Sequence, residues 1–87
     1  MSNPWIKLGE EGNTEYRLFA KYEQKDLYWH HDKEDRVVRC IHGECQLQLD
    51  NELPNTMYPG ESYFIPKEEM HRLIADGQPF ILEITFK

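Results

Sequence analysis

The chain has 87 residues, of which 39% are hydrophobic and 13% aromatic, and its formal net charge is −6. This content suits one small packed domain, while the acidic balance argues against partners such as nucleic acid or an anionic membrane surface. No apolar run is long enough for a transmembrane helix, and the first residues lack the layout of a signal peptide. The sequence therefore predicts a single cytoplasmic domain over residues 1–87.

The first half of the chain is predicted to form short strands separated by turns. Residues 1–15, in which Gly and Asn are frequent, are expected to be a loose lead-in with one short strand. Residues 16–22 and 27–31 are rich in aromatic side chains and favour strands. The clearest strand is 36–42, and we expect a hairpin turn at His42-Gly43 because glycine adopts a positive φ at low cost.

The second half continues the same pattern. Residues 44–50 alternate between apolar and polar side chains, as a half-buried strand does. Shorter strands are expected at 53–58, 62–65 and 70–75, and a last strand at 80–86. One face of that last strand carries Phe80, Leu82, Ile84 and Phe86. No segment has a helical period with caps, so the sequence predicts an all-β fold, a small antiparallel β-barrel.

The two cysteines, Cys40 and Cys45, flank the predicted turn. That spacing would allow a cross-strand disulfide, or a metal clip that also includes His42. We expect two free thiols instead, because a cytoplasmic setting keeps cysteines reduced and a free cysteine packs as a small hydrophobic residue.

A motif in the second half resembles the cupin superfamily. The cupin motif there runs Gly, five residues, Pro-x-Gly, two residues, His, three residues, Asn. In this chain Gly60, Pro66 and His71 match it at the same spacing. Glu68 stands at the position of the second glycine, and Ala75 at that of the asparagine.

The other cupin motif falls on the preceding segment. It runs His-x-His, three or four residues, Glu, six residues, Gly. Anchored on Gly43, the chain has Arg36 at the glutamate, His31 at the second histidine and Trp29 at the first. The resemblance covers roughly residues 28–86 and implies a small antiparallel jelly-roll barrel.

The resemblance also implies where a metal would bind. His31 and His71 match two of the four usual cupin ligands, whereas an indole at Trp29 and a guanidinium at Arg36 have no lone pair to offer. His30 is expected to face away from the barrel, because neighbouring residues of a strand point to opposite faces. The cofactor would be a divalent transition metal such as Zn, Fe, Ni or Mn. A third ligand would come from His30, Glu34 or Asp35.

The non-metal interpretation is a pocket for a small acidic or sugar-like molecule. A guanidinium binds carboxylates and phosphates bidentately, so Arg36 would hold such a ligand. The residues predicted to line this pocket are Trp29, His31, Arg36, Tyr63 and His71. The alternatives are a metal-dependent cupin enzyme of the dioxygenase or isomerase type, using His31, His71 and a carboxylate, and a non-catalytic dimeric sensor or structural module.

Three further expectations concern the remaining charged residues and the assembly. Asp32 and the other acidic residues of its loop are expected on the solvated surface. Glu83 would pair with Arg36 if its face of the last strand turns inward. We expect a homodimer, because so short a chain has a thin core and because the resemblance to cupins implies one.

Overall fold

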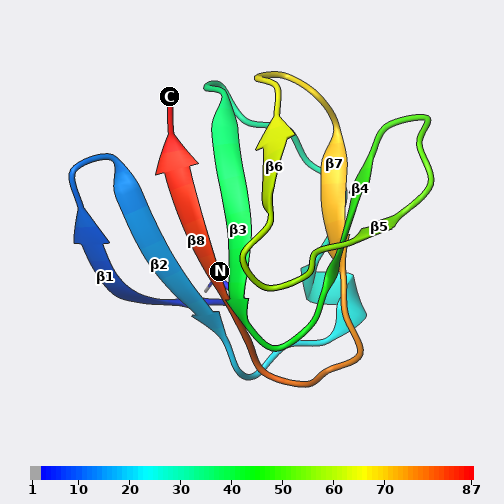
Figure 1. Cartoon of the computed structure of the whole chain (residues 1–87). Helices are drawn as coiled ribbons and strands as arrows, with labels where there is room; N and C mark the ends of the chain where they lie inside the picture. Colours follow the sequence, from blue (N-terminus) through cyan, green and yellow to red (C-terminus); the bar gives the residue numbers. More distant parts are fainter. Residues whose placement is uncertain (1–2) are drawn as a thin grey trace.

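Two antiparallel sheets face each other in the computed structural model, which describes residues 3–87 (Figure 1). The five-stranded sheet has the spatial order β1 (Ile6–Glu11), β2 (Thr14–Phe19), β8 (Phe80–Phe86), β3 (Arg36–His42) and β6 (Ser62–Ile65). The three-stranded sheet has the order β5 (Asn55–Thr56), β4 (Gln46–Leu49) and β7 (His71–Ile74). The predicted all-β jelly-roll architecture is confirmed.

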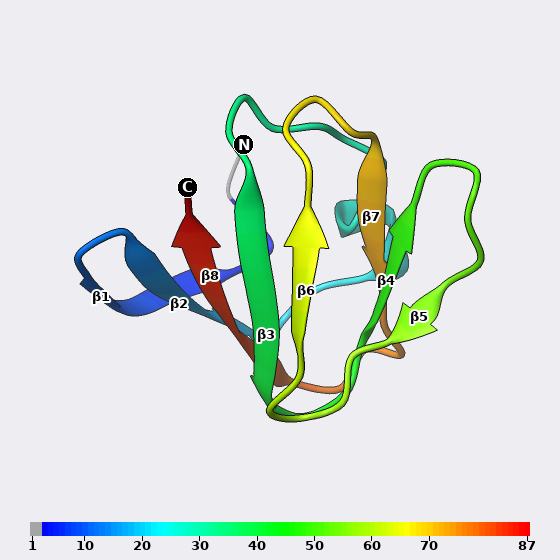
Figure 2. The same cartoon turned by 45° about the horizontal axis from the view of Figure 1, so that its top comes forward.

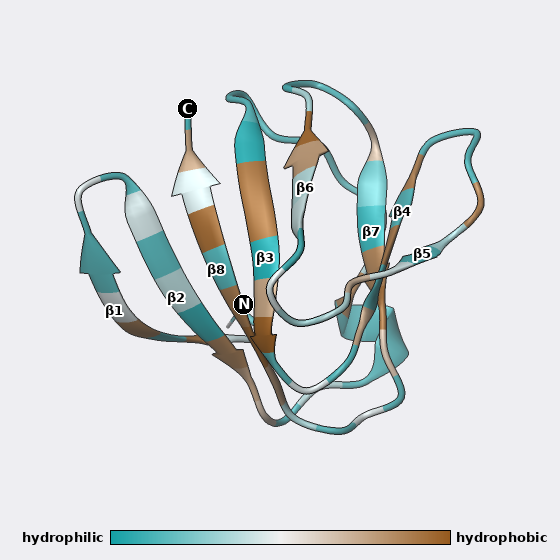
Figure 3. Ribbon diagram, viewed as in Figure 1, coloured by the Kyte–Doolittle hydropathy of each residue, from teal (hydrophilic) through white to brown (hydrophobic). Residues whose placement is uncertain are grey.

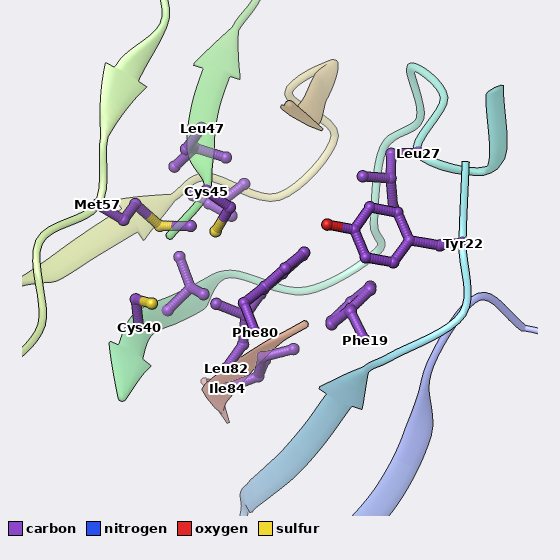
Figure 4. Close-up of a cluster of buried hydrophobic side chains, with 12 residues drawn as sticks. Phe19, Tyr22, Leu27, Cys40, Cys45, Leu47, Met57, Phe80, Leu82 and Ile84 are labelled. Atoms are coloured by element: carbon purple, nitrogen blue, oxygen red, sulfur yellow. The ribbon is translucent and has the colours of Figure 1, made fainter. Parts of the chain in front are cut away.

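The core lies between the sheets because apolar and polar residues alternate along the central strands (Figure 3). On β8, Phe80, Leu82 and Ile84 are buried, as the alternation predicts. Phe80 stacks on Phe19 with ring centroids 4.5 Å apart, and Tyr22 meets Phe80 edge-on at 5.4 Å (Figure 4). These aromatic rings fill the barrel where β8 begins and leave its other end to polar side chains.

The outer face of the five-stranded sheet holds a polar cluster around Glu83. The Glu83 carboxylate accepts hydrogen bonds from the Tyr16 hydroxyl and from Nη2 of Arg39, each at 3.0 Å. Arg36 belongs to the inner face, two positions along β3 from buried Val38. The expected pair between Glu83 and Arg36 is therefore wrong.

The N-terminal part of the chain is more regular than expected. β1 and β2 pair as a hairpin, and Gly12 between them has a φ of 60°. The segment 1–15 therefore contains all of β1 and the start of β2, where the sequence predicts a loose lead-in with one short strand. Glycine at a hairpin turn explains the difference, because the same residue that signals a loop also closes a hairpin.

The predicted hairpin at Gly43 is wrong. β3 pairs with β6 and β8, whereas β4 pairs with β5 and β7, so the chain crosses from one sheet to the other here. Gly43 has a φ of 80°, and a Cβ added to it would lie 2.5 Å from the carbonyl oxygen of Pro79. The glycine is needed for a close crossing rather than for a two-strand turn.

The predicted strand at 27–31 is also absent. A short 3-10 helix, Gln24–Asp26, precedes it, and the backbone then makes only an isolated bridge between His30 and His71. The loss of the strand matters for the site, because it removes the alternation on which the orientation of His30 and His31 was predicted.

Within residues 3–87 no helix is long and apolar enough to cross a membrane.

Both cysteines are buried free thiols. The Sγ of Cys40 lies 3.4 Å from the carbonyl oxygens of His42 and Gly43. Burial raises the pKa of Cys40 and of Cys45 above the ordinary value of a thiol. The expectation that they pack as small hydrophobic residues is confirmed, and as protonated, buried thiols they are poor nucleophiles and metal ligands.

Candidate metal centre

Two loops meet at one end of the barrel, the segment before β3 and the loop between β6 and β7 (Figures 1 and 2). The backbone N–H of His30 donates to the carbonyl of His71 at 3.0 Å, and that of His71 donates back at 2.8 Å. The N–H of Glu68 donates to the carbonyl of Asp32 at 2.7 Å. The backbone itself therefore brings His30, Asp32 and His71 together.

The side chains of His30, Asp32 and His71 each direct one ligand atom to a common point, and these atoms lie within 4.8 Å of one another. Nε2 of His71 is 3.2 Å from Oδ2 of Asp32, and Nε2 of His30 is 4.0 Å from Oδ1. The His71 side chain is 5% exposed, that of Asp32 11% and that of His30 42%. Two imidazoles and one carboxylate with open positions are a donor set typical of non-haem iron(II) sites.

Both imidazole rings are oriented by a backbone carbonyl two residues earlier. Nδ1 of His30 lies 3.0 Å from the carbonyl oxygen of Tyr28, and Nδ1 of His71 lies 2.8 Å from that of Glu69. A carbonyl only accepts hydrogen bonds, so Nδ1 carries the proton in each neutral ring. The lone pair is then on Nε2, which faces Asp32. Metal-binding histidines usually have this second hydrogen bond on the ring nitrogen away from the metal.

The carboxylate of Asp32 has one oxygen beside a cation and one without a partner. Nη2 of Arg36 lies 3.3 Å from Oδ1. Oδ2 is buried and makes no hydrogen bond to any residue within 3–87. Burial lowers the pKa of His71, which favours the neutral ring and sets a nitrogen lone pair against Oδ2. A cation between them would remove this repulsion, so the donor set fits a divalent metal.

Arg36 stands at the position of the cupin glutamate and supports the site instead of supplying a ligand. Its Nε and Nη2 bond to the Glu34 carboxylate at 2.8 and 2.7 Å. Its guanidinium carbon lies 4.8 Å from the ring centroid of Phe86. Held in this way, Arg36 fixes Oδ1 of Asp32, while Oδ2 faces Nε2 of His71.

A pocket of about 290 Å³ adjoins this group. Its polar lining includes His30, Asp32, Arg36, His71 and Arg17. Its apolar lining includes Phe19, Val38, Leu47, Ile65, Leu82 and Ile84. A polar group at one side and apolar walls at the other are the usual composition of a small-molecule pocket.

The structure exchanges the roles predicted for His30 and His31. His30 lies beside His71, with ring centroids 4.3 Å apart. His31 is 52% exposed, and its Nδ1 is 2.9 Å from the Glu68 carboxylate, outside the pocket. Because 27–31 is not a strand, the two histidines do not alternate about a sheet.

Of the other predicted pocket residues, His71 and Arg36 line the pocket, whereas Trp29 and Tyr63 do not. The Trp29 ring lies under the guanidinium of Arg72 at 4.9 Å. The Tyr63 hydroxyl donates to the carbonyl of Thr56 at 3.0 Å, which turns it away from the site.

The three candidates for a third ligand have separate positions. His30 is in the site. Glu34 holds Arg36, and the Asp35 carboxylate accepts the backbone N–H of Lys67 at 2.8 Å. Glu34 therefore holds the first residue of β3 and Asp35 holds the loop between β6 and β7, so neither carboxylate belongs to the group of His30, Asp32 and His71.

Asp32 is the site residue that the sequence interpretation placed on the surface. The first cupin motif permits three or four residues before its glutamate, and the four-residue version selects His31. With three residues, Arg36 and Gly43 keep their places while the histidine pair falls on His30 and Asp32. The structure brings His30, Asp32, Arg36 and His71 together, so the three-residue version is the one that this fold contains.

Comparison with known proteins identifies the fold. Neither a family model nor a curated protein matches the sequence. A cupin-2 domain containing protein from Shewanella frigidimarina is 24% identical over 95% of this chain and 79% of its own, with a TM-score of 0.69. The DMSP lyase DddQ from Ruegeria pomeroyi is 16% identical, covers 95% of this chain and 45% of its own, and has a TM-score of 0.71.

HppE, in a structure with Co(II) and substrate, is 15% identical, covers 85% of this chain and 43% of its own, and has a TM-score of 0.66. The chain thus spans less than half the length of DddQ and of HppE. At these identities the likeness concerns the fold alone. The chain has the cupin fold, and the resemblance found in its motifs is confirmed at that level.

Proposed function

We propose that the protein binds a divalent transition metal through His30, Asp32 and His71 and a small acidic molecule in the adjoining pocket. One observation carries the proposal: His30, Asp32 and His71 bring one ligand atom each within 4.8 Å of one another, and Oδ2 of Asp32 is buried without a hydrogen-bond partner among the described residues. The cupin fold and the Co(II) in the structurally similar HppE support it. A metal with three protein ligands keeps open positions for a ligand oxygen.

The residues around the proposed metal have distinct tasks. His30, Asp32 and His71 would hold it, and a bound metal would supply Lewis-acid chemistry toward an oxygen of the ligand. The carbonyls of Tyr28 and Glu69 keep the Nδ1 protons in place and aim both imidazoles. The catalytic form of the proposal is a metal-dependent cupin enzyme of the dioxygenase or isomerase type.

A second candidate is a metal-free pocket. The 3.2 Å distance between Nε2 of His71 and Oδ2 of Asp32 suits an ion pair if His71 carries both ring protons. The pocket would then bind its acidic ligand through side chains alone. A third candidate, a dimeric sensor or structural module with a filled barrel, is disfavoured by the pocket of about 290 Å³.

The decisive experiment measures metal content in tag-free protein after incubation with Zn, Fe, Ni, Mn or Co and desalting. We expect stoichiometric metal in the parent protein. Substitutions His30→Ala and Asp32→Asn should each weaken metal binding by at least about tenfold, because the first removes a ligand and the second replaces an anionic ligand by a neutral amide. The matched control His31→Ala should bind metal like the parent, since its ring lies outside the site.

Two outcomes would contradict the metal proposal. A parent protein that takes up none of these metals would leave the metal-free pocket as the better description. Equal loss of metal in His31→Ala and His30→Ala would show that the metal lies elsewhere on the molecule.

A further inference from the structure

We propose that Arg17 is the residue that binds the carboxylate of the pocket's ligand, and that this ligand is a small carboxylic acid with an apolar body. The inference rests on the proposed function only in placing a ligand in this pocket. Arg17 is on the inner face of β2, its side chain is 13% exposed, and it lines the pocket.

Aromatic rings hold the guanidinium of Arg17 in a fixed place. Its central carbon lies 3.8 Å from the ring centroid of Trp5 and 5.8 Å from that of Phe86. Guanidinium groups stack favourably on such rings. The cation is therefore positioned by Trp5 and Phe86 whether or not a ligand is present.

The guanidinium of Arg17 is paired with one carboxylate of its own strand. Its Nε donates to the carboxylate of Glu15. Glu15 lies two residues before Arg17 on β2 and does not line the pocket, whereas Arg17 does. Two terminal nitrogens in a planar fork match the two oxygens of a carboxylate. A guanidinium that lines the pocket and is held at Nε can offer these terminal nitrogens to a ligand carboxylate.

Arg36, the other arginine of the pocket, is engaged differently. Its Nε and Nη2 bind Glu34, and Nη2 also lies 3.3 Å from Asp32. Two carboxylates therefore compete with a ligand for Arg36, whereas Glu15 alone competes for Arg17. The anion-binding role expected for Arg36 is better suited to Arg17, and Arg36 positions Asp32.

The walls near Arg17 select the rest of the ligand. Phe19, Leu82 and Ile84 line the same pocket and are buried. An apolar body gains free energy by covering such side chains. Arginine binds carboxylate and phosphate alike, but inorganic phosphate has no apolar body to cover these walls, so the pocket favours a carboxylic acid.

The test is a chemical-shift titration of the metal-loaded protein with butyrate as the probe, alongside butanol and inorganic phosphate. We expect butyrate to bind more tightly than either. Arg17→Gln should weaken butyrate binding by on the order of ten- to a hundredfold, the range of a charge-assisted hydrogen-bonded pair. The affinity of Arg17→Lys for butyrate should lie between those of the parent and Arg17→Gln, because lysine keeps the charge and lacks the planar pair of donors.

The matched control is Arg72→Gln. Arg72 also lies over an indole, that of Trp29 at 4.9 Å, and does not line the pocket. Its substitution should leave butyrate binding unchanged. Thermal melts of each variant establish folding, and if Arg17→Gln fails to fold, the comparison of Arg17→Lys with the parent decides.

The outcomes separate this inference from the metal proposal. Unchanged butyrate binding in Arg17→Gln, equal binding of butyrate and butanol, or tighter binding of phosphate would overturn it. Metal uptake by a parent protein that binds no butyrate would also overturn it while leaving the metal site standing. The parent protein could also take up no metal and, in its metal-free form, still bind butyrate in a way that depends on Arg17. That result would support the role of Arg17 and contradict the metal proposal.

Discussion

Glu68 has a φ of 63°, in the left-handed region that favours glycine. This is the position at which the second cupin motif has its second glycine. An L side chain in this conformation costs about 1–2 kcal/mol. The backbone N–H of Glu68 donates to the carbonyl of Asp32 at 2.7 Å, so the strained residue is one that joins the two ligand loops. The loop keeps the glycine geometry without the glycine.

Glu68→Gly should raise the free energy of unfolding by about 0.5–1 kcal/mol, because the relief of strain exceeds the chain entropy that glycine adds to the unfolded state. The lost contact with His31 is exposed and contributes little. Urea unfolding monitored by fluorescence measures the change. Glu68→Ala is the control: it removes the same carboxylate but keeps the Cβ, so its stability should stay near that of the parent. Equal stabilisation by both substitutions would attribute the effect to charge instead of backbone strain.

The sequence interpretation placed His71 and Arg36 at the site, offered His30 only as one of three candidates for a third ligand, and missed Asp32. His71 follows a proline and a glycine at fixed spacings, and this spacing can be recognised whatever the conformation of the loop. The orientations of His30 and His31 were inferred from strand alternation, which applies only where a strand exists. The backbone there makes a single bridge to His71, so the local conformation, and with it the inward residue, depends on a distant partner.

At the scale of elements, the crossing at Gly43 allows a sharp stability test. Gly43→Ala places a Cβ 2.5 Å from the carbonyl oxygen of Pro79 at a φ of 80°. We expect a loss of about 2–5 kcal/mol, from backbone strain and from displacement of the neighbouring strand. The comparison is Gly60→Ala, which has a φ of 90° but open space around the added Cβ. It should cost only about 1–2 kcal/mol.

Urea midpoints of the two glycine variants measure the difference. Equal losses would mean that the close approach to Pro79 relaxes without cost. A larger loss for Gly60→Ala would contradict the assignment of Gly43 as the tight crossing between the sheets.

The strands themselves were predictable where apolar alternation is strong. β3 and β8 have the predicted bounds, 36–42 and 80–86, because both carry a buried face with a period of two. The partner strands of β3 and of β4 could not be predicted in the same way. A glycine after a strand reports that the chain turns, whereas the choice of partner depends on which distant strands bury the same face.

For the whole molecule, the homodimer remains a prediction, and β1 gives it a physical basis. β1 is an edge strand of the five-stranded sheet, and its Ile6 and Leu8 side chains are exposed. Such an edge is a template for pairing with another chain. Light scattering coupled to size exclusion should give twice the mass of one chain.

The substitution Ile6→Lys should shift that equilibrium toward the monomer, because a charge on an exposed edge strand opposes pairing. Lys7→Gln, at the neighbouring position, serves as the comparison and should leave the mass unchanged. A parent protein that runs as a monomer at high concentration would contradict the dimer. Dissociation by Lys7→Gln to the same extent as by Ile6→Lys would show that the apolar side chain is not what holds the copies together.

The backbone bonds that join His30 to His71 and Glu68 to Asp32 have a thermodynamic consequence. In zinc fingers the metal organises its own ligands, so binding and folding are one equilibrium. Here the backbone brings the proposed ligands together without a metal, so little of the free energy of metal binding would be spent on ordering loops. Folding therefore would not require the metal: a chelator should remove a bound metal while the barrel stays folded, although a bound metal would still raise the free energy of unfolding by mass action.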